Sequence, residues 1–216
     1  MLGLTDAERL LIVTPKALIP DQQLIWNAPA PWNTNASPDS VLEYMTRVDH
    51  FLDKTGITYK EMDLLFKLTF SMTPGSLTNP TKHLFIKHND LTCNTEKKEI
   101  VNLTVDSLDR IHRFLRLQKK TGWSFEVLDE IISQTKLGTG ILDDACLIIA
   151  AKLQKLSTET GIKVSELLGF YGDIPHKIIQ DNISKPLYHQ VFLNKAKNGF
   201  IDDGLLPTNI GELLLI

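Results

Sequence analysis

From Thr104 to Ser133 the chain reads TVDSLDRIHRFLRLQKKTGWSFEVLDEIIS, which is the pattern of two amphipathic helices joined at Thr121-Gly122. Apolar residues recur every three or four positions in both halves, so each helix is predicted to bury one face. Either Thr104 or Asp106 can cap the first helix, because each offers a side-chain oxygen to unpaired backbone N–H groups. The glycine stands where a helix end favours a left-handed residue. The stretch therefore predicts a helical hairpin.

The same pattern surrounds two further pairs, Thr55-Gly56 and Thr160-Gly161. When the three pairs are aligned, the positions seven and four before the threonine, and two, four and seven after it, are apolar or aromatic in every copy. In chain order these residues are Val48, Phe51, Ile57, Tyr59, Met62, Phe114, Leu117, Trp123, Phe125, Leu128, Leu153, Leu156, Ile162, Val164 and Leu167. The spacing of the copies is irregular. The sequence thus predicts a mainly α fold with the helix–Thr-Gly–helix hairpin repeated three times, rather than a regular solenoid.

Residues 73–103 interrupt the helical pattern. Thr73-Pro74-Gly75 and Asn79-Pro80 are turn signals, and residues 84–86 and 100–103 are short runs of β-type residues. Such runs separated by turn residues are typical of paired strands. We expect a small β-hairpin or meander inserted between the first and second helical hairpins.

Residues 1–36 are predicted to form a separate N-terminal region. A capping box of Thr5 and Glu8 opens a short helix that Pro15 ends. Residues 14–36 are rich in proline and cannot form one helix, so we expect an extended arm. Trp26 and Trp32 are expected to pack this arm against the core, the alternative being an exposed contact site.

Residues 37–216 are predicted to form an α-helical domain that carries the β insertion at about 73–103. Ser37-Pro38 starts a helix that continues through Leu52, and a second capping box at Thr58 starts a helix that runs to about Phe70. Residues 142–156 are apolar nearly all round, which predicts the central buried helix.

Two short helices are predicted near the end of the chain. One spans residues 164–171 and stops at Gly172 and Pro175, and the other begins at Ser184. The last four residues are apolar, whereas chain ends are usually polar and mobile. We expect that the chain was cut inside an element of a longer protein; the alternative is a terminal element docked on the core.

Composition excludes several function classes. The 216 residues carry a net charge of −3, so the whole chain is not expected to attract nucleic acid or anionic membranes. The two cysteines, Cys93 and Cys146, provide no disulfide framework, and Cys146 is predicted to be a buried free thiol. No secretory signal is apparent, and no apolar run approaches the roughly 20 residues that span a bilayer.

No motif of an enzyme or metal site is present in the sequence. The six histidines are scattered: His50, His83, His88, His112, His176 and His189. The spacing of His83, His88 and Cys93 fits no closed metal site. The acidic pairs Asp143-Asp144 and Asp202-Asp203 are more typical of helix caps or solvated turns than of an acid and base. We therefore predict a protein that is not an enzyme and binds no cofactor.

Basic side chains recur along one side of the helix at 104–120. The candidate docking residues are Arg110, Arg113, Arg116 and Lys120. They could contact nucleic acid, an acidic lipid surface or an acidic partner. The alternative, which the net negative charge favours, is a solvated flank paired locally with Asp106, Asp109 or Glu126. A DNA-binding regulator is a distant third hypothesis, because the helices show no base-reading row of Arg, Asn and Gln on one exposed face.

Residues 100–132, IVNLTVDSLDRIHRFLRLQKKTGWSFEVLDEII, resemble the helical region of the A component of bacterial insecticidal toxin complexes, the Tc toxins, also described as the virulence plasmid A protein family. The family signature is an "NLT" turn followed by LDRI-x-RF-x-RL-x-x-K-x-GWS-x-x-x-LD. It is matched here by Asn102, Leu103, Thr104, Leu108, Asp109, Arg110, Ile111, Arg113, Phe114, Arg116, Leu117, Lys120, Gly122, Trp123, Ser124, Leu128 and Asp129. Weaker similarity to the family is found before the signature, at residues 48–58, and after it, at residues 167–172 and 187–196. The resemblance covers most of the chain from about residue 38.

The resemblance implies a structural role. The family's A component is a very long chain that forms a bell-shaped pentamer, binds host cells and drives a channel through the membrane after a pH-triggered change. The segment resembled here belongs to its outer α-helical shell. The implied partners are other regions or protomers of the A component, with the B–C components and the host cell surface as further candidates. Direct membrane insertion by this segment and nucleic-acid binding are not implied. The implied location is outside the bacterium, after release as part of the complex. This chain carries no channel or receptor-binding region, so pore formation is not carried over to it alone.

Overall fold

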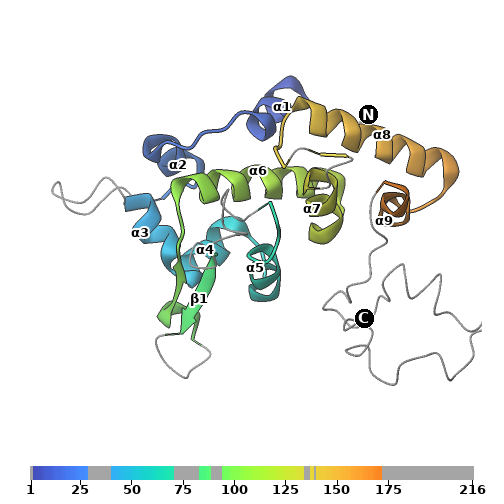
Figure 1. Ribbon diagram of the computed structural model, residues 1–216. Coiled ribbons are helices and arrows are strands. Elements are labelled where there is room, and N and C mark those ends of the chain that lie inside the picture. Colours follow the sequence, from blue (N-terminus) through green and yellow to red (C-terminus); the bar gives the residue numbers. More distant parts are fainter. Residues whose placement is uncertain are drawn as a thin grey trace, which may run out of the picture. The chain divides into compact units, whose positions relative to one another are not determined.

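The computed structural model describes residues 2–28, 40–70, 83–88, 94–133, 137–138 and 140–171 (Figure 1). In these ranges the protein is mainly α-helical with one two-stranded antiparallel sheet, which confirms the predicted fold class. The chain divides into two compact units, residues 1–161 and 162–216. The predicted boundary between residues 36 and 37 stays a prediction, because residues 29–39 lie outside the described ranges.

The centre of the first unit is helix α6, Val105–Thr121, which Figure 1 shows running across the middle of that unit. Thr104 caps it: its hydroxyl accepts the N–H of Ser107 at 3.1 Å, and the Ser107 hydroxyl accepts the N–H of Thr104 at 2.8 Å. Nine of its residues are buried. Helix α7, Phe125–Ser133, follows after Gly122 and buries Phe125, Leu128, Ile131 and Ile132. The predicted hairpin is confirmed.

Helix α8, Asp144–Thr160, is not the central buried helix that its composition predicts. It buries only one face, through Cys146, Leu147, Ala150 and Leu153, whereas Ile148 is 55% exposed. Part of the apolar surface of α8 is therefore left exposed by the described segments that pack against it. The prediction that Cys146 is a buried free thiol is confirmed.

The three Thr-Gly pairs share one local structure. Each threonine is the last residue of its helix, and each following glycine has a positive φ: 69° at Gly56, 68° at Gly122 and 72° at Gly161. Each threonine hydroxyl donates a hydrogen bond to the carbonyl four residues earlier. The oxygen–oxygen distance is 2.7 Å for Thr55, 3.0 Å for Thr121 and 2.7 Å for Thr160. The threonine hydroxyl therefore bonds back to the preceding turn of its own helix, and the glycine accepts the left-handed backbone that ends the helix.

Both helices beside the first pair, and the helix after the third pair, are shorter than their counterparts at the second pair, whereas α8 before the third pair is as long as α6. Around Gly56 they are α4, Val48–Thr55, and α5, Tyr59–Leu65. After Gly161 comes α9, Val164–Leu167, in the second unit, continued by the 3-10 turn η4, Leu168–Phe170. The residues seven before and seven after each threonine are buried in all three copies. Those positions are the inner face that the repeat predicts.

The predicted β insertion contains one hairpin in its described part. Strand β1, Phe85–His88, pairs antiparallel with β2, Lys98–Val101, and Phe85 lies opposite Val101. The 3-10 turn η3, Thr95–Lys97, leads into β2. The turn signals at Thr73-Pro74-Gly75 and Asn79-Pro80, together with Cys93, lie outside the described residues.

The helix predicted from Ser37 through Leu52 is in fact two helices. Helix α3, Ser40–Thr46, stops before Arg47, whose backbone is extended and pairs with Glu99 as an isolated β-bridge. The sheet edge therefore competes with the helix at this residue, which periodicity alone cannot reveal. The proposed cap at Ser37-Pro38 lies outside the described residues.

The helix predicted to reach Phe70 ends at Leu65. The chain turns away because the Asp129 carboxylate of α7 accepts the backbone N–H groups of Thr69 at 3.0 Å and Phe70 at 2.7 Å. Those two groups are thereby satisfied outside a helix. A contact over some sixty residues of chain thus sets this helix end.

The N-terminal region is partly as predicted. Helix α1, Asp6–Val13, has the expected capping box of Thr5 and Glu8. The extended arm is wrong for Ile19–Ile25, which forms helix α2 with a proline in its first turn, where a missing N–H costs nothing. Trp26 packs inside as expected and is 6% exposed. Pro29, Pro31 and Trp32 lie outside the described residues.

The predictions that concern residues after 171 lie outside the described residues. They are the helix stop at Gly172 and Pro175, the helix from Ser184, the acidic pair at 202–203, His176, His189 and the apolar end of the chain.

Candidate functional site

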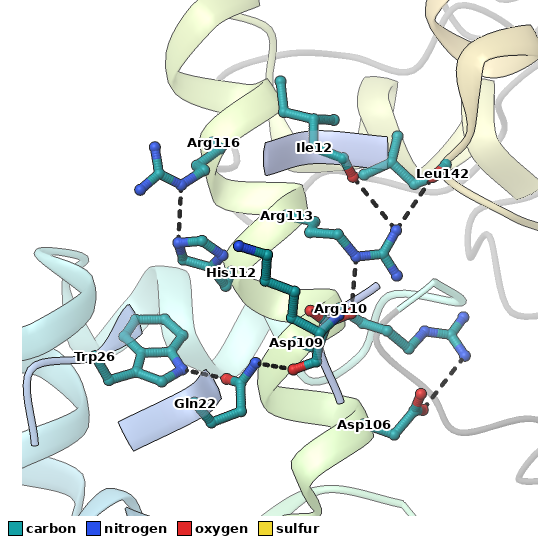
Figure 2. A network of polar contacts seen from close by, with 11 residues as sticks. Ile12, Gln22, Trp26, Asp106, Asp109, Arg110, His112, Arg113, Arg116 and Leu142 are labelled. Carbon is teal, nitrogen blue, oxygen red and sulfur yellow. Dashed lines mark hydrogen bonds and ion pairs between the residues drawn. The ribbon is translucent and has the colours of Figure 1, made fainter. Parts of the chain in front are cut away.

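Helix α6 carries a buried ion pair, Asp109 with Arg113, that is also hydrogen-bonded to the backbone of the N-terminal region (Figure 2). The Asp109 carboxylate receives the Arg113 Nε–H at 2.8 Å and the backbone N–H of Lys16 at 2.9 Å. Asp109 is 1% exposed, and Arg113 is 6% exposed. Because a buried charge is costly unless paired and hydrogen-bonded, this pair depends on every one of these contacts.

Arg113 also binds two backbone carbonyls. Its Nη1 donates to the carbonyl of Ile12 at 3.3 Å and to that of Leu142 at 3.1 Å. These carbonyls belong to the end of α1 and to the loop before α8. The guanidinium therefore ties three segments of the first unit together, and its role there is structural.

The four candidate docking residues do not share one exposed face. Arg113 is inside, so the predicted solvated flank is wrong for it. The Arg110 guanidinium lies 4.7 Å from the centre of the Phe70 ring, and its side chain is 13% exposed. Burial lowers the pKa of Arg110 from its usual value, and Asp106, 4.0 Å away, opposes that shift. Arg116 and Lys120 remain exposed.

Local pairing is confirmed for two of the four residues, since Arg113 pairs with Asp109 and Arg110 with Asp106. Arg110 Nε has no hydrogen-bond partner within the described part of the chain. The docking role of the set stays a prediction for Arg116 and Lys120, whose side chains a partner can reach.

Arg116 is oriented by His112, one helical turn earlier. Its Nε–H donates to His112 Nε2 at 2.8 Å, so that ring nitrogen acts as acceptor (Figure 2). The His112 and Trp26 rings pack edge to face with a centroid distance of 5.4 Å. The Trp26 indole N–H in turn donates to Gln22 Oε1 at 2.7 Å, and Gln22 Nε2 donates to the Lys16 carbonyl at 2.7 Å. A chain of side chains from α2 thus fixes the position of Arg116.

Burial, reinforced by the charge of Arg116, lowers the pKa of His112 from 6.5 to about 4. The folded protein therefore keeps this ring neutral at pH values where an unfolded chain takes up a proton. The associated stability is present above pH 6.5 and is lost as the pH falls from 6.5 towards 4.

We expect the free energy of unfolding to fall by about 2 kcal/mol more in the wild type than in His112→Gln between pH 7 and pH 5, at ~1.4 kcal/mol per pKa unit. Glutamine keeps an acceptor for Arg116 but does not titrate. Urea denaturation at the two pH values, followed by circular dichroism, measures this difference. Equal losses in the two proteins would contradict it.

Beside Arg116 the surface is hollowed. The hollow has a volume of about 230 Å³ and is lined by Leu4, Glu8, Ile12, Arg116, Lys119 and Lys120. Lys120 Nζ lies 3.2 Å from Glu8 Oε1 and 3.5 Å from Oε2. The pKa of Glu8 is lowered by its hydrogen bond from the Thr5 backbone and by Lys120. The hollow thus brings together α1 and the last turns of α6.

Sequence reasoning found Arg116 and Lys120 but missed Lys119, His112 and Glu8. Helical spacing could have indicated His112, because residues four apart on a helix are neighbours. No sequence signal places Glu8 beside Lys120, since the contact depends on how α1 packs.

Side chains that could ligate a metal ion do not gather within the described residues. No group of three or more His, Cys, Asp or Glu in these ranges could hold a metal ion. Burial raises the pKa of Cys146 to about 12, so its thiol is no nucleophile near neutral pH. Asp129, whose pKa is raised by burial, is engaged with the backbone of Thr69 and Phe70. Within the described ranges, no helix combines the length and apolarity needed to cross a membrane.

Comparisons of the chain with protein-family models, with curated proteins and with solved structures find no match.

Proposed function

We propose that this chain is a non-enzymatic structural segment of the A component of a bacterial insecticidal toxin complex, and that it forms part of the outer helical shell. The observation that carries the proposal is the signature at Asn102–Asp129. In this role the segment contributes to assembly of a pentameric cell-binding and translocation pore, and it is released from the bacterium as part of the complex.

The environment of the signature residues supports a scaffold role. Its apolar members Leu108, Ile111, Phe114, Leu117 and Leu128 are buried. Its charged members Asp109 and Arg113 pair with each other, and Asp129 binds the backbone of residues 69–70. These three charged residues hold the fold together, as expected of a motif that specifies a structure, whereas Arg116 and Lys120 of the same signature stay exposed.

The length of the native product tests the proposal. An antibody raised to this chain should detect, in the natural source, a protein on the order of ten times larger than 24.4 kDa, well beyond a single domain. A shell segment belongs to a very long chain, so a native product of only 24.4 kDa would contradict the proposed shell role. Intact mass spectrometry of the captured protein is the measurement.

The second candidate function is a free-standing helical module that docks an acidic partner. The exposed Arg116 and Lys120 beside the hollow favour it. Reversing both charges, Arg116→Glu with Lys120→Glu, separates the two functions: the module loses its partner, whereas a shell segment folds and behaves as before. Arg113 is excluded from this test, since reversing a buried charge would disrupt the fold.

A further inference from the structure

The hollow between α1 and α6 has an unbalanced charge. Three cationic side chains, Arg116, Lys119 and Lys120, line it together with one carboxylate, Glu8. Leu4 supplies apolar surface, and Ile12 lies beneath it, 2% exposed. At about 230 Å³ it is smaller than the ~300–1,000 Å³ typical of pockets for whole small molecules. Its size therefore suits a side chain better than a free metabolite.

Glu8 shows that one of these cations, Lys120, accepts a carboxylate. Lys120 contacts both of its oxygens. Glu8 is at the same time held by Thr5, whose backbone N–H donates to Oε2 at 2.8 Å to complete the capping box. Because Glu8 belongs to α1 and is fixed there, it cannot move to neutralise the other two cations.

Arg116 is set to receive a second carboxylate. Its Nε is engaged by His112, which lies inside the protein against Trp26. This contact holds the guanidinium plane, while the side chain stays exposed. A planar guanidinium binds a carboxylate with two parallel hydrogen bonds, and fixing the plane beforehand lowers the entropy lost on binding. Lys119 Nζ makes only a long contact, 3.4 Å, with the Thr55 carbonyl.

We propose that this hollow, the carboxylate site, binds an aspartate or glutamate side chain of an acidic protein segment. Arg116 and Lys119 take the carboxylate, and Leu4 contacts its methylene groups. A nucleic acid is disfavoured, because the chain carries a net charge of −3. The inference deepens the second candidate function and is independent of the toxin assignment, which the length of the native product tests separately.

The test uses the full chain and two fluorescein-labelled peptides, one with glutamates interspersed among leucines and the other with glutamine at every glutamate position. Fluorescence anisotropy should show binding of the glutamate peptide only. Arg116→Gln should weaken it about tenfold, as expected for a charge-assisted bidentate contact. The matched control is Lys152→Gln, an exposed cation on α8, which should leave binding unchanged.

Glu8→Gln gives the sharper test. Glutamine retains the capping box, so α1 is expected to stay folded. Losing the carboxylate frees Lys120 and removes a repelling charge, so the glutamate peptide should bind about threefold more tightly. A merely structural role for Glu8 predicts no such gain. Unchanged or weaker binding by Glu8→Gln would overturn the proposal.

Three further outcomes would also overturn it. They are equal binding of the two peptides, equal effects of Arg116→Gln and Lys152→Gln, and displacement of the peptide by inorganic phosphate or duplex DNA at equal concentration. Circular dichroism checks that each variant is folded. Should Arg116→Gln fail to fold, Arg116→Lys keeps the charge but not the planar fork and should still weaken binding severalfold.

Discussion

Asp109→Asn is expected to lower the free energy of unfolding by about 3–5 kcal/mol, the cost of removing one partner from a buried ion pair. Asparagine has nearly the same shape, so no cavity is created. It lacks the charge that compensates Arg113, whose guanidinium is buried among the carbonyls of Ile12 and Leu142. Urea denaturation followed by circular dichroism at 222 nm measures the loss.

Asp106→Asn is the matched control. Asp106 stands on the same helix and faces Arg110 at 4.0 Å, but its side chain is 52% exposed. Exposed ion pairs contribute about 0–1 kcal/mol, so we expect a loss within that range. Similar losses in the two variants would contradict this prediction, because they would show that the Asp109–Arg113 pair stabilises the fold no more than an exposed ion pair does.

Phe114→Ala is expected to cost about 3–5 kcal/mol, the typical loss for truncating a buried aromatic residue. Phe114 is 1% exposed and contacts two other rings, Phe70 at 5.8 Å and Phe125 at 5.6 Å between centroids. Alanine would leave a cavity between three parts of the chain: helix α6, helix α7 and the segment that follows α5. The same urea denaturation measures the effect.

Leu24→Ala serves as the control for Phe114→Ala. Leu24 on α2 is also a large apolar residue, but it is 83% exposed. Truncating it removes little buried area, so we expect a change within about 0.5 kcal/mol. If Phe114→Ala lowered the free energy of unfolding by as little as Leu24→Ala, the prediction that α6 and its neighbours form a close-packed core would be wrong.

Some of the candidate site is visible in the sequence. Arg116 and Lys120 follow from the basic side of α6, because residues on one helix have fixed relative positions. Arg113 has the same sequence signature as Arg116, yet one is buried and the other exposed. The difference comes from the end of α1 and the loop at Leu142, which cover Arg113 and supply its carbonyl partners.

The sequence by itself determines the local elements of this protein. The Thr-Gly pairs end helices because a hydroxyl can bond back to the preceding turn and glycine accepts a positive φ, and both reasons lie within a few residues. The capping boxes at Thr5 and Thr58 are local in the same way.

Only the tertiary structure decided which helix is central, where the helices at Arg47 and Leu65 stop, and which charges are buried. Helical periodicity shows that a face must be covered, but it does not show what covers it. Glu99 pairs with Arg47, Asp129 binds residues 69–70, and α1 packs beside α6. Each of these contacts joins residues more than fifty positions apart, so no local pattern encodes them.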